Sequence, residues 1–273
     1  ITGSNSFEIE YNAVSDMDTV INMTNHSYFN LNGEGSGSIV NHKTVIHAVS
    51  FTPLRAGAIP TGEVRAVEKT PMDFRKIKRI GNDINSEYEQ IKIAGGYDHN
   101  WVIDHPDSQN LAECVEVYGD KTGIAMKISS DYPGIQMYTG NYIGNVKGKH
   151  GHIYAPRDGV CFEPQYFPDA VNRPEFESSV CKAGQKFDKK IKMLLRTALL
   201  LLKDLLINGG FMKKISELMP EAYDFNGKLP LKQAIPLGLQ HVMAMFVGNL
   251  TPLLIITGAC RIGAGSEYAS VQV

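Results

Sequence analysis

The chain has 273 residues, enough for one large or two small domains. Its 27 Lys and Arg residues nearly balance its 29 Asp and Glu residues, so no strong electrostatic field predicts a nucleic-acid partner. The four cysteines lack CxxC spacing, which argues against a zinc site or a disulfide framework and is compatible with a reducing compartment such as the cytoplasm.

Short runs in which apolar and polar residues alternate extend to about residue 190. They occupy residues 7–11, 19–23, 43–49, 113–118 and 123–129, and turn-forming residues separate them at 32–38, 60–62, 118–123 and 133–134. No segment in this region keeps a helical period for three turns. The pattern therefore predicts an antiparallel β-sandwich or barrel, in which each strand has one packed face and one wet face.

Residues 161–172 (CFEPQYFPDAVN) place an acid and an amide one residue apart in an apolar, aromatic segment. If this segment is a strand, Glu163 and Gln165 point to the same face. The carboxylate could take a proton from a substrate hydroxyl, and the amide could hold that hydroxyl by a hydrogen bond. The alternative is a glutamate at a solvated sheet edge beside a proline.

Two other stretches cluster polar and aromatic residues. Residues 24–33 (TNHSYFNLNG) contain His26, and residues 95–101 (GGYDHNW) contain Asp98 close to Trp101. Singly, His26 could be a hydrogen-bonded core histidine, Asp98 a turn residue and Trp101 a core filler. Together with Glu163 they indicate a sugar site, because a pyranose is held by carboxylates and amides above an aromatic platform.

Six motifs follow one another in an order that carries a family resemblance. They are TNHSYFNL at 24–31, IPTGE at 59–63, TPMDFR at 70–75, GYDHNW at 96–101, PGIQMYTGN at 133–141 and EPQYFPDA at 163–170. In this order, over about residues 19–190, the chain resembles the aldose 1-epimerase, or galactose mutarotase, family. The resemblance implies a β-sandwich that interconverts the α and β anomers of hexoses such as galactose and glucose.

The resemblance also implies roles for individual residues. His26 corresponds to the general acid that acts on the ring oxygen, Glu163 to the general base that acts on the C1 hydroxyl, and Asp98 to a ligand of sugar hydroxyls. We add Asn25 and Gln165 as sugar-binding candidates. The reaction needs one proton removed and one delivered, so no metal, nucleotide or redox cofactor is expected. A non-catalytic carbohydrate-binding module is the alternative.

The start of the chain departs from the family pattern. The chain begins with Ile1 rather than Met, and the family's upstream arginine and second sugar-site histidine have no counterpart before residue 24. We therefore expect a chain that opens mid-protein, with sheet edges uncovered and with weak or no activity on its own.

The composition changes after residues 1–190. Residues 189–211 are Leu-rich, and we expect an amphipathic helix or a non-native junction there, within a helical or irregular region at 191–233. Residues 234–260 contain no charged residue and are a candidate transmembrane helix. Through this helix the chain would associate with a membrane. The alternative is a buried helix of a soluble domain. Residues 261–273 form a tail.

A second resemblance covers residues 212–260, which look like the start of a nucleobase (uracil/xanthine) permease. It is carried by LPLKQAIPLGLQHVMAMFVGNLTPLLI, with Gln240 and His241 as the Gln-His pair typical of the first membrane helix. One helix cannot form an alternating-access pathway, so transport is not expected from this chain. The rival interpretation is nevertheless that the chain is a fragment of a membrane transport protein, to which the β region is attached without contributing to transport.

Overall fold

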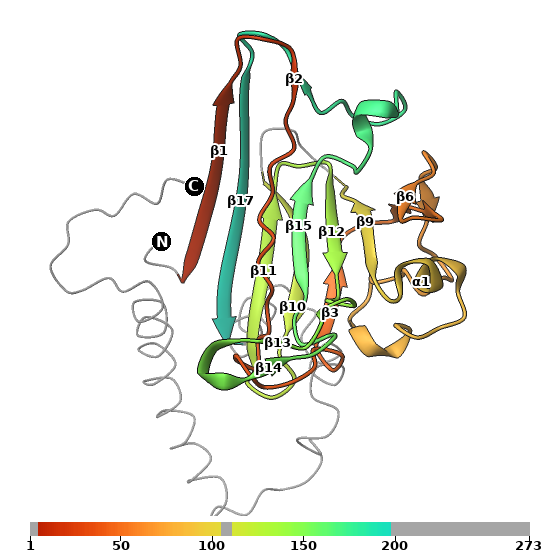
Figure 1. Ribbon diagram of the computed structural model, residues 1–273, viewed down its shortest axis with the longest axis vertical. Helices are drawn as coiled ribbons and strands as arrows, with labels where there is room; N and C mark the ends of the chain where they lie inside the picture. The colour runs from red at the N-terminus through yellow and green to blue at the C-terminus, as the bar shows by residue number, and fades with distance from the viewer. Residues whose placement is uncertain (1–4, 105–110, 198–273) are drawn as a thin grey trace, which may run out of the picture. The chain divides into compact units, whose positions relative to one another are not determined.

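Two antiparallel sheets dominate the computed structural model, which describes residues 5–104 and 111–197. The larger sheet has the strand order β1 (Ser6–Val14), β17 (Lys186–Thr197), β11 (Ile124–Ser130), β10 (Ala112–Tyr118), β3 (Lys43–Ile46) and β8 (Lys78–Arg79). The smaller one has the order β15 (Cys161–Gln165), β12 (Gly134–Tyr138), β9 (Asp98–Val102), β4 (Ser50–Thr52) and β7 (Arg65–Ala66). Figure 1 shows both sheets, with β15, β12 and β9 side by side.

Shorter elements connect these sheets. Three two-stranded ribbons pair β13 (Val146–Lys147) with β14 (Ile153–Tyr154), β16 (Val180–Cys181) with β2 (Thr19–Val20), and β5 (Leu54–Arg55) with β6 (Ile59–Pro60). The described residues form one short α-helix, α1 (Glu89–Ala94), and three 3₁₀ turns at Ile80–Asn82, Lys149–Gly151 and Ala170–Asn172. The prediction of a mainly β, antiparallel fold is therefore confirmed for the part of the chain that the structure describes.

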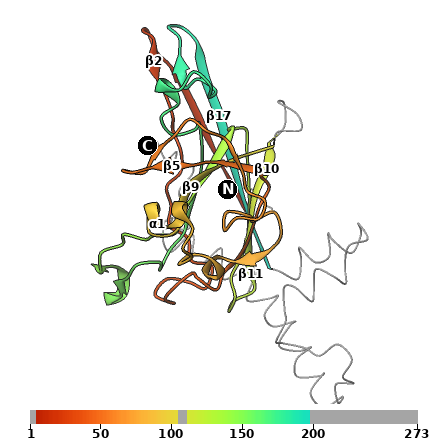
Figure 2. The same ribbon diagram turned by 90° about the vertical axis from the view of Figure 1, so that its right-hand side faces the viewer.

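One apolar core joins the two sheets, which lie as two layers in Figure 2. The larger sheet contributes alternate residues such as Val115, Val117 and Ile128, and the smaller sheet contributes Phe51 and Trp101. These side chains are almost completely buried. Because side chains in a strand alternate between faces, each sheet turns one face to this core and keeps the other for solvent or for a site.

Strand β17 corrects the boundary expected at residue 190. It continues to Thr197 and pairs with β1 on one side and β11 on the other. Ile191 and Met193 are buried in the core, whereas Lys190 and Lys192 pair with Glu10 and Glu8 of β1 at 2.6 and 3.0 Å. The helix expected from residue 189 is therefore wrong over 189–197, because pairing on both sides overrides the helix propensity of leucine.

The remaining C-terminal predictions fall outside the described residues. These are the rest of the junction to residue 233, the apolar segment at 234–260 and the tail at 261–273. Within residues 5–104 and 111–197, no helix is both long and apolar enough to span a bilayer.

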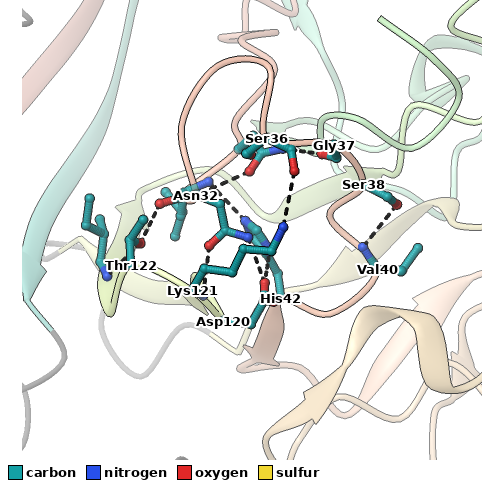
Figure 3. Close-up of polar contacts among 12 residues, drawn as sticks. Asn32, Ser36, Gly37, Ser38, Val40, His42, Asp120, Lys121 and Thr122 are labelled. Atoms are coloured by element: carbon teal, nitrogen blue, oxygen red, sulfur yellow. Dashed lines mark hydrogen bonds and ion pairs between the residues drawn. The ribbon is translucent and has the colours of Figure 1, made fainter.

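A buried histidine, His42, fixes the loop that follows the motif at residues 24–31 (Figure 3). His42 is fully buried, and its Nε2 accepts a hydrogen bond of 2.9 Å from the backbone N–H of Leu31. The proton of the ring therefore lies on Nδ1, which donates to Oδ1 of Asp120 at 3.1 Å. Asn32 donates to the same Asp120 oxygen at 2.8 Å, and Thr122 donates to the carbonyl of Leu31 at 2.7 Å. The loop is thus held to the turn between β10 and β11.

Replacement of His42 by alanine should destabilise the fold. It leaves the Leu31 N–H and the Asp120 carboxylate without their partner and opens a cavity, so we expect the free energy of unfolding to fall by about 2–4 kcal/mol. Urea unfolding followed by circular dichroism measures this loss. His152→Ala, at a half-exposed histidine, is the control and should change stability by less than about 0.5 kcal/mol. Equal effects of the two changes would contradict the structural role of His42.

Candidate functional site

The smaller sheet has one apolar and one polar face. In the paired register of β9, β12 and β15, Asn100, Gln136 and Glu163 form one row across the strands. Residues directly opposite each other in antiparallel strands project to the same face. The row on one side consists of Asp98, Tyr138 and Cys161. The row on the other side consists of Val102, Gly134 and Gln165. The sheet thus gathers two carboxylates and three amides on the face away from the core.

The intervening residues point the other way. Trp101 is fully buried in the core, where its Nε1 donates to the carbonyl of Met72 at 3.0 Å. His99 and Phe162 share that apolar face and are also fully buried. Trp101 is therefore a core residue rather than a platform beneath a sugar, as its alternation with Asp98 requires.

The segment that carries His26 runs along the free edge of β15. Phe29 exchanges backbone hydrogen bonds of 2.8 and 2.9 Å with Val160, immediately before β15. On the other side of His26, the Asn22 side chain exchanges hydrogen bonds of 2.9 and 3.1 Å with the backbone of Tyr166, immediately after β15. Because both ends of this segment are fixed to the edge, His26 is held beside the polar face.

His26 and Glu163 meet at the centre of this arrangement. Nε2 of His26 lies 3.4 Å from Oε1 of Glu163, and the two side chains are 52% and 9% exposed. The rings of Tyr28 and Tyr138 flank the imidazole, with centroids 5.4 and 6.3 Å away. A buried carboxylate thus contacts an imidazole that remains open to solvent and can exchange protons with it.

The electrostatics of this pair follow from burial. Desolvation raises the pKa of Glu163 to about 7, His26 opposes that shift, and the negative charge of Asp98 adds to it. Burial likewise raises the pKa of Asp98, against the hydrogen bond from Gln136 and the charge of His26. A carboxyl group with a pKa near neutrality is well suited to general base catalysis, since it is partly ionised and still basic.

Gln136 is a site residue that motif reasoning missed. Its Nε2 donates to Oδ1 of Asp98 at 2.7 Å, and its Oε1 is buried without a hydrogen-bond partner among the described residues. In the same part of the chain, Oδ1 of Asn100 and Oγ1 of Thr24 are buried and equally lack partners. Buried polar atoms normally have partners, so Oε1 of Gln136, whose amide nitrogen already contacts Asp98 on the polar face, is available to a ligand hydroxyl. The alternation of residues 134–138 beside the strand of Glu163 is the signal that could have identified Gln136.

The other two sequence-predicted residues have different surroundings. Gln165 is buried on the face of Glu163, opposite Gly134 of β12, as the period of two predicted. Asn25 is half-buried, and its Oδ1 accepts the backbone N–H of Ser27 at 3.2 Å in a local turn. The structure therefore brings His26, Glu163, Asp98 and Gln165 together, whereas Asn25 shapes the loop beside them.

A cavity of about 670 Å³ lies next to this cluster. Its lining includes Tyr28, whose ring contacts that of His26, together with Tyr142, Ile143 and Tyr154. Neither His26 nor Glu163 lines it. The pair of His26 and Glu163 thus lies outside this cavity, which it borders through Tyr28.

The cluster also contains a set of possible metal ligands. The donor atoms of His26, Cys161 and Glu163 lie within 4.8 Å of one another. However, burial raises the pKa of the Cys161 thiol well above its usual range, and the charges of Glu163 and Asp98 raise it further. A protonated thiol is a poor ligand, so acid–base chemistry suits this cluster better than metal binding.

Comparisons with known proteins identify the family of the larger part of the chain. The protein-family model described as Aldose 1-epimerase matches residues 1–194. A galactose mutarotase from Bos taurus is 37% identical over 181 residues, which are 66% of this chain and 51% of that protein. An aldose 1-epimerase from Escherichia coli is 33% identical over 190 residues, which are 68% of this chain and 54% of that protein. The chain thus spans about half the length of the curated relatives that it matches.

Solved structures support the fold. The GalM/aldose epimerase homologue from C. elegans superposes with a TM-score of 0.63 at 26% identity, covering 71% of this chain and 57% of that one. Galactose 1-epimerase from Lactobacillus acidophilus gives a TM-score of 0.58 at 25% identity, over 71% of this chain and 54% of that one. None of these findings supports the permease resemblance of residues 212–260, which begin beyond the matched region. The family match over most of the chain, on a fold shared with solved members, shows that the chain belongs to the aldose 1-epimerase family.

Proposed function

We propose that this chain carries the catalytic acid and base of an aldose 1-epimerase, which interconverts the α and β anomers of hexopyranoses such as galactose and glucose. The observation that carries this proposal is the contact of 3.4 Å between His26 Nε2 and Glu163 Oε1, with burial raising the pKa of the carboxyl group to about 7. The family membership of residues 1–194 supports it.

The two groups would act on two oxygens of the sugar. Glu163 takes the proton of the C1 hydroxyl, and protonated His26 delivers a proton to the ring oxygen as the bond between C1 and the ring oxygen breaks. The C1 oxygen becomes the carbonyl oxygen of the open-chain aldose. Rotation about the C1–C2 bond exposes the other face, and the reverse proton transfers close the ring and restore both side chains. Because the two sugar oxygens share one carbon, neighbouring acid and base groups can reach both.

The polar face supplies groups that would hold the remaining hydroxyls. Asp98 accepts hydrogen bonds, and Gln136, which already donates to Asp98, has its buried Oε1 available within the described part of the chain. Gln165 lies one row further along. In this proposal Asn25 acts mainly through the loop of His26, since its amide oxygen binds the N–H of Ser27.

The mutarotase relatives are about twice as long as the region matched here, so the activity of this chain by itself stays a prediction. Weak turnover or sugar binding without turnover are the outcomes expected from the sequence. The rival function of a membrane transport fragment depends on residues 212–260, which lie outside the described residues. The comparisons reported above do not support it.

Glu163→Gln should remove most of the activity and leave sugar binding intact. The amide keeps the shape and hydrogen bonds of the side chain but cannot accept the C1 proton, so we expect kcat to fall by roughly 10²- to 10⁴-fold. Polarimetry of freshly dissolved α-galactose measures kcat, and calorimetric titration measures binding. Unchanged kcat would show that Glu163 is not the base; sugar binding without turnover in the unmodified chain would favour the non-catalytic module.

The pH profile should follow the ionisation of Glu163. Since Glu163 must be ionised and His26 protonated, kcat/KM should have a bell-shaped pH profile, and its rising limb should be set by Glu163, whose pKa is raised to about 7. Asp98→Asn removes a negative charge that helps to raise this pKa, so the midpoint should move to lower pH, with a separate loss of sugar affinity. A midpoint that stays in place, or moves to higher pH, would contradict the coupling of the two carboxyl groups.

Gln136→Leu tests the residue that only the structure identifies. Loss of its hydrogen bonds to Asp98 and to a sugar hydroxyl should raise KM roughly tenfold or more. Gln165→Leu is the matched change on the neighbouring row, and we expect the smaller effect from it because Gln165 makes no hydrogen bond to either carboxylate among the described residues. Steady-state kinetics on both variants shows which change raises KM more. A larger increase from Gln165→Leu would contradict the assignment of Gln136 as the more important sugar-binding residue.

A further inference from the structure

A second cluster of polar side chains lies on the larger sheet, away from the proposed sugar site. It consists of His47, which follows β3, and of Glu113 and Glu116 on β10. On β10, Val115 and Val117 belong to the core, so the alternating Glu116 lies on the opposite face of that sheet. The cluster is thus separated from His26 and Glu163 by the apolar layer between the two sheets.

A β-bulge brings the two glutamates together. Residues three apart in a regular strand project to opposite faces, so Glu113 and Glu116 would diverge. The register of β10 against β11 shifts between Glu113 and Val115, which leaves Cys114 as the extra residue and turns Glu113 to the side of Glu116. The backbone N–H of His47 donates to the carbonyl of Cys114 at 2.9 Å, so the histidine is fixed to the bulge itself.

Three donor atoms converge in this cluster. Nε2 of His47 lies 3.3 Å from Oε1 of Glu113 and 3.6 Å from Oε1 of Glu116, and all three atoms lie within 4.8 Å of one another. Ligands about 2.0–2.1 Å from a tetrahedral Zn²⁺ ion are about 3.3–3.4 Å apart, whereas neighbouring ligands of an octahedral Mg²⁺ ion are about 3.0 Å apart. The separations from the imidazole nitrogen are therefore those of two edges of a zinc tetrahedron.

The second oxygen of each carboxylate is occupied by a donor that would orient it. Nζ of Lys127 binds Oε2 of Glu113 at 2.7 Å, and the hydroxyl of Tyr118 donates to Oε2 of Glu116. Both Oε1 atoms are thereby turned towards His47. Hydrogen bonds to Glu113 and Glu116 raise the pKa of His47 to about 9, so the cluster is close to neutral at pH 7 and an ion must displace the imidazole proton in order to bind. Partners of this kind hold the ligands of metal sites in place.

We propose that His47, Glu113 and Glu116 bind a divalent transition-metal ion of the zinc type, with solvent as the fourth ligand. The side chains of His47 and Glu113 are 42% and 37% exposed, so an ion can enter and keep a water ligand, whereas that of Glu116 is only 9% exposed. One imidazole nitrogen and two carboxylate oxygens suit Zn²⁺ or Co²⁺ better than Mg²⁺ or Ca²⁺, which prefer all-oxygen sites. Binding would join the end of β3 to the bulge of β10.

The test is titration of the full chain with Zn²⁺ by calorimetry and with Co²⁺ by absorption spectroscopy, in a Cys161→Ser background that removes the thiol of the other cluster. We expect one ion to bind with the visible d–d bands of a four-coordinate Co²⁺ site, and Mg²⁺ to bind at least tenfold more weakly. His47→Gln and Glu113→Gln should each abolish this event. Tyr118→Phe, which removes the donor to Glu116, should weaken it by roughly 10- to 100-fold.

His152→Gln is the matched control, because His152 is also half-exposed and lies 3.7 Å from a single glutamate, Glu34. It should leave the titration unchanged, and circular dichroism checks that every variant is folded. The proposal is overturned if the chain binds no Zn²⁺, if binding survives His47→Gln or Glu113→Gln, or if the His152 change is equally damaging. A thiolate-to-cobalt band that appears only when Cys161 is present would place the ion at the other cluster.

Discussion

The antiparallel pairing of β12 with β9 and β15 is the constraint on which both the core and the site depend. The register puts Gln136 between Asn100 and Glu163, and it puts Ile135 and Met137 into the core on the other side. A shift of the register would therefore displace the polar-face and the core-face side chains of β12 together. The apolar face, which includes the fully buried Trp101, thus supplies the packing that holds a polar face with two carboxylates.

The proposed acid lies on a different type of element than the proposed base. Glu163 lies on a regular strand, whereas His26 lies on an irregular segment that follows the edge of that strand. Edge strands expose unpaired backbone groups, and the segment before β3 covers part of this edge through its bridge to Val160 and the hydrogen bonds of Asn22. Burial of Glu163 raises its pKa to about 7, whereas the charge of His26, which this segment carries, opposes the rise, so the covering segment also adjusts the acidity of the carboxyl group.

The parts of the fold that follow from local periodicity could be predicted from the sequence. The alternating runs correspond to β1, β10 and β11, and the prediction that Glu163 and Gln165 share one face is correct because β15 is a strand. The motif order identified the family that the comparisons also show. These inferences need only a period of two and short sequence signatures.

The features that depend on partners distant in sequence could not be predicted in this way. The Leu-rich residues of β17 looked helical because their period is ambiguous, and only pairing with β1 and β11 decides their state. Gln136 joins Asp98 only through the strand register, and Glu113 joins Glu116 only through a bulge. Trp101 was placed in the site by its closeness to Asp98 in the sequence, although neighbours along a strand face opposite ways.

The strict alternation along β12 also limits how this protein can evolve. Exchange of one residue for another on the polar face, at Gln136 or Tyr138, alters the groups offered to a ligand and leaves the packed layer intact. Loss or gain of a single residue within the strand would instead swap the two faces, burying amides and exposing Ile135 and Met137. Insertions and deletions should therefore be tolerated in the turns rather than in this strand. Point substitutions on its polar face can change ligand preference without disturbing the core.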